Sequence, residues 1–319
     1  MKKLSLFVFV FFLFFVPSAK VLSKSLYKPK VFDCFLFFNE FDVLDIRLHE
    51  LYNKVDKFIL VESTRGFLNT PKPLYFQENK VRYAKFLDKI VHVVVDEFPE
   101  FSPVGNTDYW EVENFQRNQI MKGLKTCNPN KRDIVMISDV DEIIKNEKID
   151  QIVKLIDKRG HDVVFGEFAC YQHFINRKLP DYLKISIATS WENLSKYIRS
   201  AQSFRNLSGF AKGHAFNGFE VLEAVKKHHP SKKWAFARVR DLGWHFTSLG
   251  DYSKYLQKIE NYSHVGMNTE HNRNLENIKK SIEQLEWCEL NDQFPRYILA
   301  NKENPQIQAL IDQKETVFH

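Results

Sequence analysis

The sequence predicts an α/β protein with a mostly parallel central sheet. Short runs rich in branched and aromatic residues alternate with segments in which apolar residues recur every three or four positions. The first pattern is typical of buried strands and the second of amphipathic helices, and their alternation indicates βαβ units. The composition is that of a globular protein, because 44% of the 319 residues are hydrophobic and 27% are charged.

The strand and helix pattern is clearest in the first half of the chain. The run 31–38 is the first predicted strand, and the apolar residues of 41–51 follow it at helical spacing. A turn-rich stretch over 63–73 separates the second strand from the next helix. The predicted strands are 31–38, 57–61, 90–95, 134–137 and 163–168, and the predicted helices are 41–51, 77–87, 109–124 and 149–156.

The pattern is looser beyond about residue 175. The chain contains no internal repeat and no Gly/Ser-rich linker. We therefore expect a single domain over 26–319, with an irregular portion over 175–319 that packs on the sheet. The later predicted elements are a strand over 234–246, helices over 251–262 and 272–287, and a segment over 191–207 that is either helix or loop.

Charge and cysteine content exclude several classes of protein. The net charge of +6 falls to +3 when the three lysines of residues 1–22 are left out, so the rest of the chain is near neutral. A nucleic-acid-binding protein would show a clustered basic face, so we expect no nucleic-acid partner. The four cysteines are far apart in the sequence, which excludes zinc-ribbon and redox spacings and favours buried or half-buried thiols.

Residues 1–25 have the three-part pattern of a signal peptide. Two lysines precede an apolar run over 4–16, and small residues follow it. The run is shorter than the ~20 residues with which a helix spans a bilayer. We expect either cleavage between Ala19 and Ser25 or retention as a type II signal anchor. Both outcomes imply export or a secretory compartment, and the second adds membrane association.

Two acidic residues follow the predicted strand 134–137 directly. Asp139 and Asp141 lie one residue apart at the strand's carboxyl end, where open parallel sheets bind their ligands. Carboxylates there can share Mg²⁺ or Mn²⁺, which neutralises a diphosphate leaving group. With 18 aspartates in the chain, about one Asp-x-Asp is expected by chance. The prediction of a metal site therefore depends on the position of the motif at the end of a strand. The alternatives are that the two acids lie in a solvated loop or cap the next helix.

Five blocks, in order from residue 31 to about residue 250, resemble glycosyltransferase family 17. They are VFDCFLFFNE (31–40), VDKFILVESTR (55–65) with PKPLYF (71–76), Trp110 with ENFQRN (113–118), SDVDE (138–142), and GWHF (243–246) with LG (249–250). The resemblance implies a GT-A-type, Rossmann-like fold that binds a nucleotide sugar. It also implies Mn²⁺ (or Mg²⁺) on the Asp-x-Asp motif and inversion at the anomeric carbon. The implied donor is UDP-N-acetylglucosamine. The implied acceptor is a glycan hydroxyl, on the side of the portion 175–319.

Further side chains are candidates for the nucleotide-sugar site. Glu62 ends the second strand, where its carboxylate could accept a hydrogen bond from uracil or ribose, or pair with Arg65. Arg65 is itself a candidate for contact with the nucleotide sugar. Asn39 follows the first strand, and its side chain either forms a hydrogen bond of the same kind with the nucleotide or caps the next helix. Gln116 and Arg117 lie on the helix before the Asp-x-Asp strand, and the planar guanidinium of Arg117 could clamp a phosphate or remain a surface charge.

His245 and two acids complete the predicted site. His245 stands in an aromatic, strand-like segment and is either a third ligand of the metal beside Asp139 and Asp141 or a buried core histidine. An inverting transfer also needs a general base for the acceptor hydroxyl. The two candidates are Glu167, near the end of a predicted strand, and Asp241, just before the block that holds His245.

Two other functions compete with glycosyl transfer. One is a sugar- or nucleotide-binding protein on the same fold that has lost turnover. The other is a metal-dependent phosphoesterase, which the sequence disfavours because Ile143 stands where an Asp-x-Asp-x-Thr nucleophile motif has threonine. Product analysis separates the three functions, since they yield a transferred sugar, no product or free phosphate.

Overall fold

The computed structural model describes residues 27–101, 109–211, 223, 226–261 and 265–313. The predicted signal peptide lies outside this part of the chain. Within it, no helix is both long and apolar enough to cross a membrane. The four cysteines, all in the described part, are free thiols, two of them buried and two half-buried, as expected.

One sheet organises the described residues. Its nine strands follow the order β3-β2-β1-β4-β7-β6-β8-β5, with β9 beside β7. Seven of them run in one direction and only β5 and β7 are reversed, so the predicted α/β class and mostly parallel sheet are confirmed. The strands are β1 (Val31–Phe37), β2 (Lys57–Ser63), β3 (Ile90–Val95), β4 (Ile134–Ile137), β5 (Glu142–Ile144), β6 (Val163–Gln172), β7 (Arg177–Ser190), β8 (Phe236–Thr247) and β9 (Glu286–Trp287).

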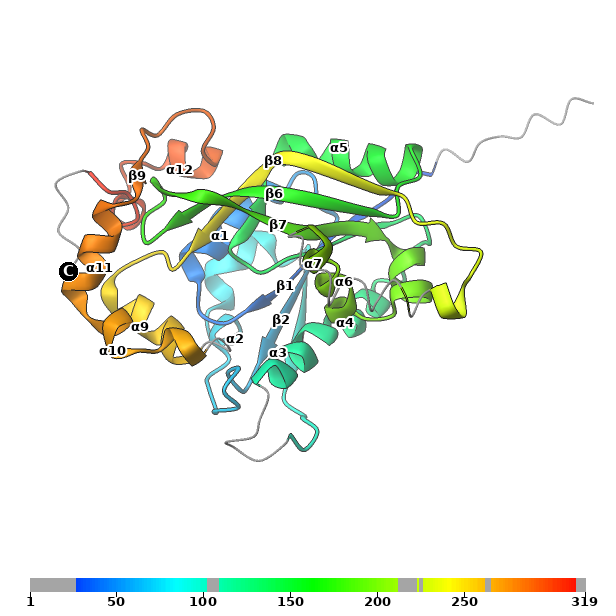
Figure 1. Cartoon of the computed structure of the whole chain (residues 1–319), viewed down its shortest axis with the longest axis horizontal. Coiled ribbons are helices and arrows are strands. Elements are labelled where there is room, and N and C mark those ends of the chain that lie inside the picture. Colours follow the sequence, from blue (N-terminus) through cyan, green and yellow to red (C-terminus); the bar gives the residue numbers. More distant parts are fainter. Residues whose placement is uncertain (1–26, 102–108, 212–222, 224–225, 262–264, 314–319) are drawn as a thin grey trace, which may run out of the picture.

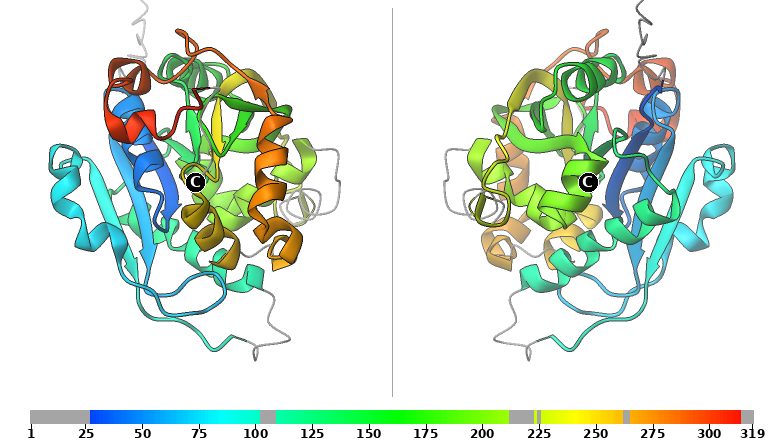
Figure 2. Two further views of the ribbon diagram at one scale, coloured as in Figure 1. Left: turned by 90° about the vertical axis from the view of Figure 1, so that its left-hand side faces the viewer. Right: turned by 90° about the vertical axis from the view of Figure 1, so that its right-hand side faces the viewer.

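Helices cover both faces of the sheet (Figures 1 and 2). Successive side chains of β1 point to opposite faces, and all are buried, which is why the strand reads as a continuous apolar run. One face packs against α1 (Phe41–Leu51), α2 (Tyr75–Glu78), the 3₁₀ helix η1 (Lys80–Phe86), α5 (Ile149–Val153) and α12 (Arg296–Ala300). The other packs against α3 (Tyr109–Asn118), α4 (Ile120–Thr126), the π-helical turn η4 (Asn193–Ile198) and α6 (Ala201–Asn206).

The last third of the chain is more regular than its sequence indicates. β7 and β8 lie inside the sheet, on either side of β6. The first half of β7 is half-buried or exposed and mixes Pro180 and charged residues with apolar ones, so it carries no alternating pattern that would predict a strand. The remaining elements are the π-helical turn η3 (Lys154–Lys158), the 3₁₀ helices η2 (Asn146–Lys148) and η5 (Val265–Met267), and the helices α7 (Ser208–Ala211), α9 (Tyr252–Asn261), α10 (Glu270–Arg273), α11 (Leu275–Glu283) and α13 (Pro305–Gln308).

Candidate active site

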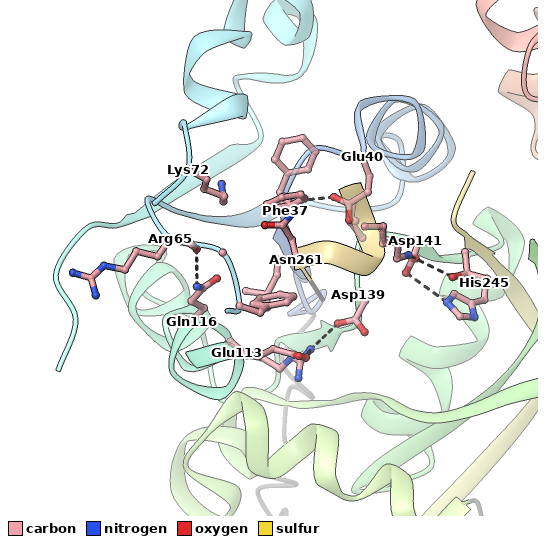
Figure 3. Close-up of a pocket in the computed structure, with 18 residues that line it drawn as sticks. Phe37, Glu40, Arg65, Lys72, Glu113, Gln116, Asp139, Asp141, His245 and Asn261 are labelled. Atoms are coloured by element: carbon pink, nitrogen blue, oxygen red, sulfur yellow. Dashed lines mark hydrogen bonds and ion pairs between the residues drawn. The ribbon is translucent and has the colours of Figure 1, made fainter. Parts of the chain in front are cut away.

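A cavity opens where the carboxyl ends of β1, β2 and β4 meet α3, the end of β8 and α9 (Figure 3). Its empty space, including the open mouth, is about 850 Å³. Apolar strand-end residues form part of the wall and charged groups form the rest. The lining residues are Leu36, Phe37, Phe38, Glu40, Arg65, Gly66, Phe67, Lys72, Glu113, Gln116, Arg117, Asp139, Val140, Asp141, His245, Thr247, Lys258 and Asn261.

The side chain of Arg47 fixes the loop that carries Asp139 and Asp141. This guanidinium is fully buried on α1 and makes two hydrogen bonds to the carboxylate of Asp33, at 2.6 and 2.8 Å. It also donates to the carbonyl oxygens of residues 139, 140 and 142 and to Oγ of Ser138. Five acceptor groups satisfy one planar cation, so the backbone of the loop has a fixed course. Sequence reasoning missed Arg47, although a charged residue among the apolar positions of 41–51 was a signal.

Asp139 is enclosed by two arginines. Its Oδ1 accepts a hydrogen bond from Arg117 at 2.9 Å, and its Oδ2 lies 3.2 Å from Nη2 of Arg205 on α6. Burial alone would raise the pKa of the Asp139 carboxyl, but Arg205 and then Arg117 outweigh it and hold the pKa well below its usual range. The side chain keeps 39% of its surface exposed toward the cavity. Asp139 is therefore ionised and oriented by cations of the chain itself.

Glu142 is the second acid that Arg205 holds. Its two carboxylate oxygens accept hydrogen bonds from Arg205 at 2.9 and 3.0 Å, and one of them also accepts the backbone N–H of Asp139 at 2.7 Å. Burial raises the pKa of the Glu142 carboxyl, and Arg205 opposes this rise. Arg205 lies in the segment that matched no known block, so no signal in the sequence marked it.

Asp141 faces the cavity between a histidine and a lysine. Nε2 of His245 lies 3.7 Å from its Oδ1, and Nζ of Lys258 on α9 lies 3.0 Å from its Oδ2. His245 reaches this position because β5 pairs with β8 and places it opposite Glu142. The pairing depends on Gly243, since a Cβ there would lie 2.0 Å from the carbonyl oxygen of Ile143.

The three predicted metal ligands, Asp139, Asp141 and His245, line the same cavity. The described residues nevertheless contain no group of three acidic, histidine or cysteine side chains placed to share a metal ion. Asp139 contacts Arg117 and Arg205, whereas Asp141 is paired with His245. That pair presents one carboxylate oxygen and one imidazole nitrogen to the same space. Such a donor set fits a divalent cation whose other ligands come from a phosphate and water.

Glu62 does not line this cavity. Its carboxylate accepts the backbone N–H groups of Phe76 and Gln77, at 2.6 and 3.2 Å, and contacts Nε2 of His92 at 3.1 Å. It therefore caps the first turn of α2. The alternative, an ion pair with Arg65, does not form in the described structure: Arg65 bonds to Asn69 and stacks on Phe98.

The other predicted nucleotide-sugar residues divide between two places. Arg65, Gln116 and Arg117 line the cavity, and Gln116 donates to the backbone carbonyl of Arg65 at 3.0 Å. Asn39 lies in a neighbouring cavity, where its side-chain amide donates to Gln257 at 3.1 Å. It does not cap α1, because Glu40 occupies the N-cap position.

Neither of the two acids expected to be the general base lines the cavity. Glu167 is in the middle of β6, which continues to Gln172, and its nearest cation is Arg238 at 3.9 Å. Asp241 is 61% exposed at a bulge of β8 and binds Lys145 at 2.7 and 2.8 Å. The sequence misled here because β6 is four residues longer than its apolar run.

The fold places the chain in the class of α/β proteins that bind a ligand at the carboxyl ends of parallel strands. The model of glycosyltransferase family 17 matches residues 21–182, about half of the chain. The chain therefore belongs to glycosyltransferase family 17 and is a glycosyltransferase. The predicted family and enzyme class are thereby confirmed.

Curated relatives carry a more specific name. The human and rat proteins named β-1,4-mannosyl-glycoprotein 4-β-N-acetylglucosaminyltransferase are each 33% identical over 111 residues, which is 33% of this chain. The match spans only 20% of the length of each relative. Among solved structures, 4-diphosphocytidyl-2C-methyl-D-erythritol synthase is 11% identical with a TM-score of 0.37, covering 66% of this chain and 90% of that one. Glucosyl-3-phosphoglycerate synthase from Mycobacterium tuberculosis is 13% identical with a TM-score of 0.35, covering 68% and 69%.

Proposed function

We propose that this glycosyltransferase moves N-acetylglucosamine from UDP-N-acetylglucosamine to a hydroxyl of a glycan, with inversion at the anomeric carbon. The observation that carries the proposal is the pairing of Asp141 with His245 at the edge of a cavity lined by β1, β2 and β4. The names of the relatives support the sugar and the acceptor class, a β-mannosyl glycoprotein glycan. Since the match covers a fifth of those proteins, donor and acceptor are proposals here.

The cavity walls have the chemistry of a nucleotide-diphosphate site. Phe37, Phe38 and Phe67 offer apolar surface against which a flat base can pack. Lys258 adds positive charge, which a diphosphate needs when it leaves water. The guanidinium of Arg65 points away from the other labelled residues in Figure 3 and bonds to Asn69. Gln116, Arg117 and the exposed edge of Asp139 remain to bind ribose or donor-sugar hydroxyls. In this proposal Glu62 positions α2 and does not touch the donor.

Asp141 and His245 would hold the divalent cation, Mn²⁺ or Mg²⁺. When bound, that cation would neutralise the negative charge that grows on the leaving diphosphate. Asp139 is then a residue that orients the donor and the loop through Arg117 and Arg205. We also propose that residues 1–25 direct the chain into an export or secretory compartment, either cleaved or kept as a type II anchor.

Thermal unfolding of the purified chain tests the donor site. UDP-N-acetylglucosamine, UDP-glucose, UDP-galactose and GDP-mannose are each added with and without Mn²⁺. We expect a Mn²⁺-dependent rise in melting temperature with UDP-N-acetylglucosamine, because a ligand at 100 times its dissociation constant stabilises by about 2.7 kcal/mol. The variant Asp141→Asn should lose the rise, whereas Asp150→Asn, an exposed aspartate that pairs with Lys54, should keep it. No shift with any donor in a cooperatively melting chain would refute the proposal.

Two further measurements complete the test. His245→Ala should raise the Mn²⁺ concentration needed for half of the donor-induced shift, and an unchanged titration would reject His245 as a ligand. Mass spectrometry of a glycopeptide with a β-mannosyl core, incubated with the donor, should show one added N-acetylhexosamine. Release of phosphate without this mass increase would instead support phosphoesterase chemistry.

A further inference from the structure

A second cavity adjoins the proposed donor cavity. The two share three lining residues, Glu40, Asp141 and Lys258. The second cavity combines aromatic rings with hydroxyl, amide and charged side chains, which is the mixture that stacks on a sugar ring and binds its hydroxyls. The residues that line only the second cavity include Asn39, Phe41, Arg82, Phe174, Ser248 and Gln306.

We propose that the second cavity binds the acceptor sugar and that Glu40 is the general base of the transfer. The proposal rests on the donor site proposed above. A base must touch the acceptor hydroxyl while that hydroxyl faces the donor's anomeric carbon, so it has to lie where the two cavities meet. Of the three shared residues, Lys258 is a cation and Asp141 is occupied by Lys258 and His245. Glu40 is the carboxylate that remains.

Glu40 also differs from the other acids of the donor cavity in the contacts that it makes. Glu113 and Asp139 pair with Arg117, and Asp141 pairs with Lys258. Within the described part of the chain, Glu40 makes no ion pair of this kind. Its Oε2 accepts the N–H groups of Phe38 and Asn39, both at 3.1 Å, which leaves Oε1 available to a ligand.

The environment of Glu40 suits a proton acceptor. Burial raises the pKa of its carboxyl, Asp141 adds to the rise, and Lys258 opposes it. A carboxylate with a raised pKa takes a proton more readily near neutral pH. Lys72, the other cation near this carboxyl, stacks on Phe38 and Tyr75.

The reaction step balances without another reagent. The acceptor hydroxyl oxygen forms a bond to the anomeric carbon as the bond from this carbon to the diphosphate oxygen breaks. The electron pair of the broken bond leaves with UDP. The hydroxyl proton moves to Oε1 of Glu40, and solvent later removes it. Hydrolysis of the donor follows the same course with water as the acceptor.

Glu40→Gln is the decisive variant. The amide oxygen of glutamine can still accept the N–H groups of Phe38 and Asn39, so the loop keeps its hydrogen bonds while the base is removed. Glu276→Gln, the same change at an exposed position of α11, is the matched control. UDP release from UDP-N-acetylglucosamine is measured with water, with the β-mannosyl glycopeptide and with azide, which carries no proton and needs no base.

We expect Glu40→Gln to lower kcat by about 100-fold or more with water and glycopeptide, as removal of a general base does. The rate with azide and the dissociation constant for UDP should stay within twofold of the wild-type values. Equal loss with azide, or full activity with the glycopeptide, would overturn the role of Glu40. If the wild-type chain releases no UDP from any donor, the proposed function fails and Glu40 fails with it. Should Glu40→Gln not fold, Glu40→Asp withdraws the carboxylate by one methylene without removing the base. We then expect a smaller loss of kcat with water and glycopeptide and none with azide, and an unchanged rate with the glycopeptide would overturn the role of Glu40.

The acceptor cavity has its own test. Ala309 lines only the second cavity, so Ala309→Trp places an indole there and leaves the donor cavity unchanged. We expect the KM for the glycopeptide to rise at least tenfold and the KM for UDP-N-acetylglucosamine to stay within twofold. An unchanged glycopeptide KM would show that the acceptor binds elsewhere.

Discussion

Arg47 and Asp33 form an ion pair beneath the loop of residues 138–142, with both side chains fully buried and two hydrogen bonds of 2.6 and 2.8 Å. The pair joins α1 to β1, and the rest of the guanidinium fastens the backbone that carries Asp139 and Asp141. The loop therefore depends on a cation that lies 92 residues earlier in the chain than Asp139. Stability and site geometry are coupled through this one residue.

Arg47→Met should destabilise the chain strongly. Removing one partner of a buried pair leaves an uncompensated charge on Asp33 and costs about 3–5 kcal/mol of unfolding free energy. Urea unfolding measures the loss. Lys54→Met is the comparison, because Lys54 pairs with Asp150 at the surface and such pairs contribute about 0–1 kcal/mol. Similar losses in the two variants would contradict the role given to Arg47.

Lys258→Met should tighten Mn²⁺ binding in the absence of nucleotide. The ammonium lies 3.0 Å from Asp141 and competes with a divalent cation for that carboxylate. The pair is largely buried, with 24% of the Lys258 side chain and 9% of the Asp141 side chain exposed. The upper value for exposed pairs, about 1 kcal/mol or about fivefold in affinity, is therefore the least effect we expect. Lys254→Met, on the same helix but paired with Asp42, should leave the affinity unchanged. The electron paramagnetic resonance signal of free Mn²⁺ measures the affinity. Weaker Mn²⁺ binding after Lys258→Met would show that Lys258 does not compete with the cation for Asp141.

Glu62→Ala separates a structural role from nucleotide binding. The substitution removes the acceptor of two backbone N–H groups at the start of α2, one of them buried, which costs about 1–3 kcal/mol. Because the carboxylate does not line the cavity, the dissociation constant for UDP should stay within twofold. Thermal unfolding measures the loss of stability, and titration with UDP measures the dissociation constant. A large loss of UDP affinity in a fully folded variant would restore Glu62 to the nucleotide site.

His173 makes stability depend on pH. Burial, with Lys258 adding to it, lowers the pKa of this histidine from 6.5 to about 4. The unfolded chain therefore binds a proton between pH 6.5 and 4 that the folded chain does not, and stability falls as the pH falls through this window. The contribution lost by pH 5.5 is on the order of 1 kcal/mol.

His173→Asn tests this dependence. Asparagine tolerates the positive φ of 64° at this position, so the backbone is preserved. Stability measured from pH 7 to 5 should fall less steeply in His173→Asn than in the wild-type chain. His271→Asn, at an exposed histidine, should keep the wild-type slope. Parallel curves for the wild type and His173→Asn would exclude His173 as the source.

Local patterns predicted several elements between residues 31 and 137. The strands 31–38, 90–95 and 134–137 and the helix 41–51 match the structure within one residue, because the apolar pattern of a buried strand or of a helix with one buried face lies in neighbouring residues of the sequence. The same holds for the position of the Asp-x-Asp motif after β4. The first half of β7 was missed because it is half-buried or exposed and mixes Pro180 and charged residues with apolar ones.

The sequence by itself determined the family, the α/β class and the strand ends at which the site lies. Only the tertiary structure decided what each site residue touches. Arg205, His245 and Lys258 reach the loop from 63 to 117 residues away, through pairings such as β5 with β8. No local pattern encodes these approaches, because they depend on strand register and helix packing across the whole sheet. For that reason Asp139 is bound by arginines and Asp141 contacts His245. For the same reason Glu40 lies where the two cavities meet.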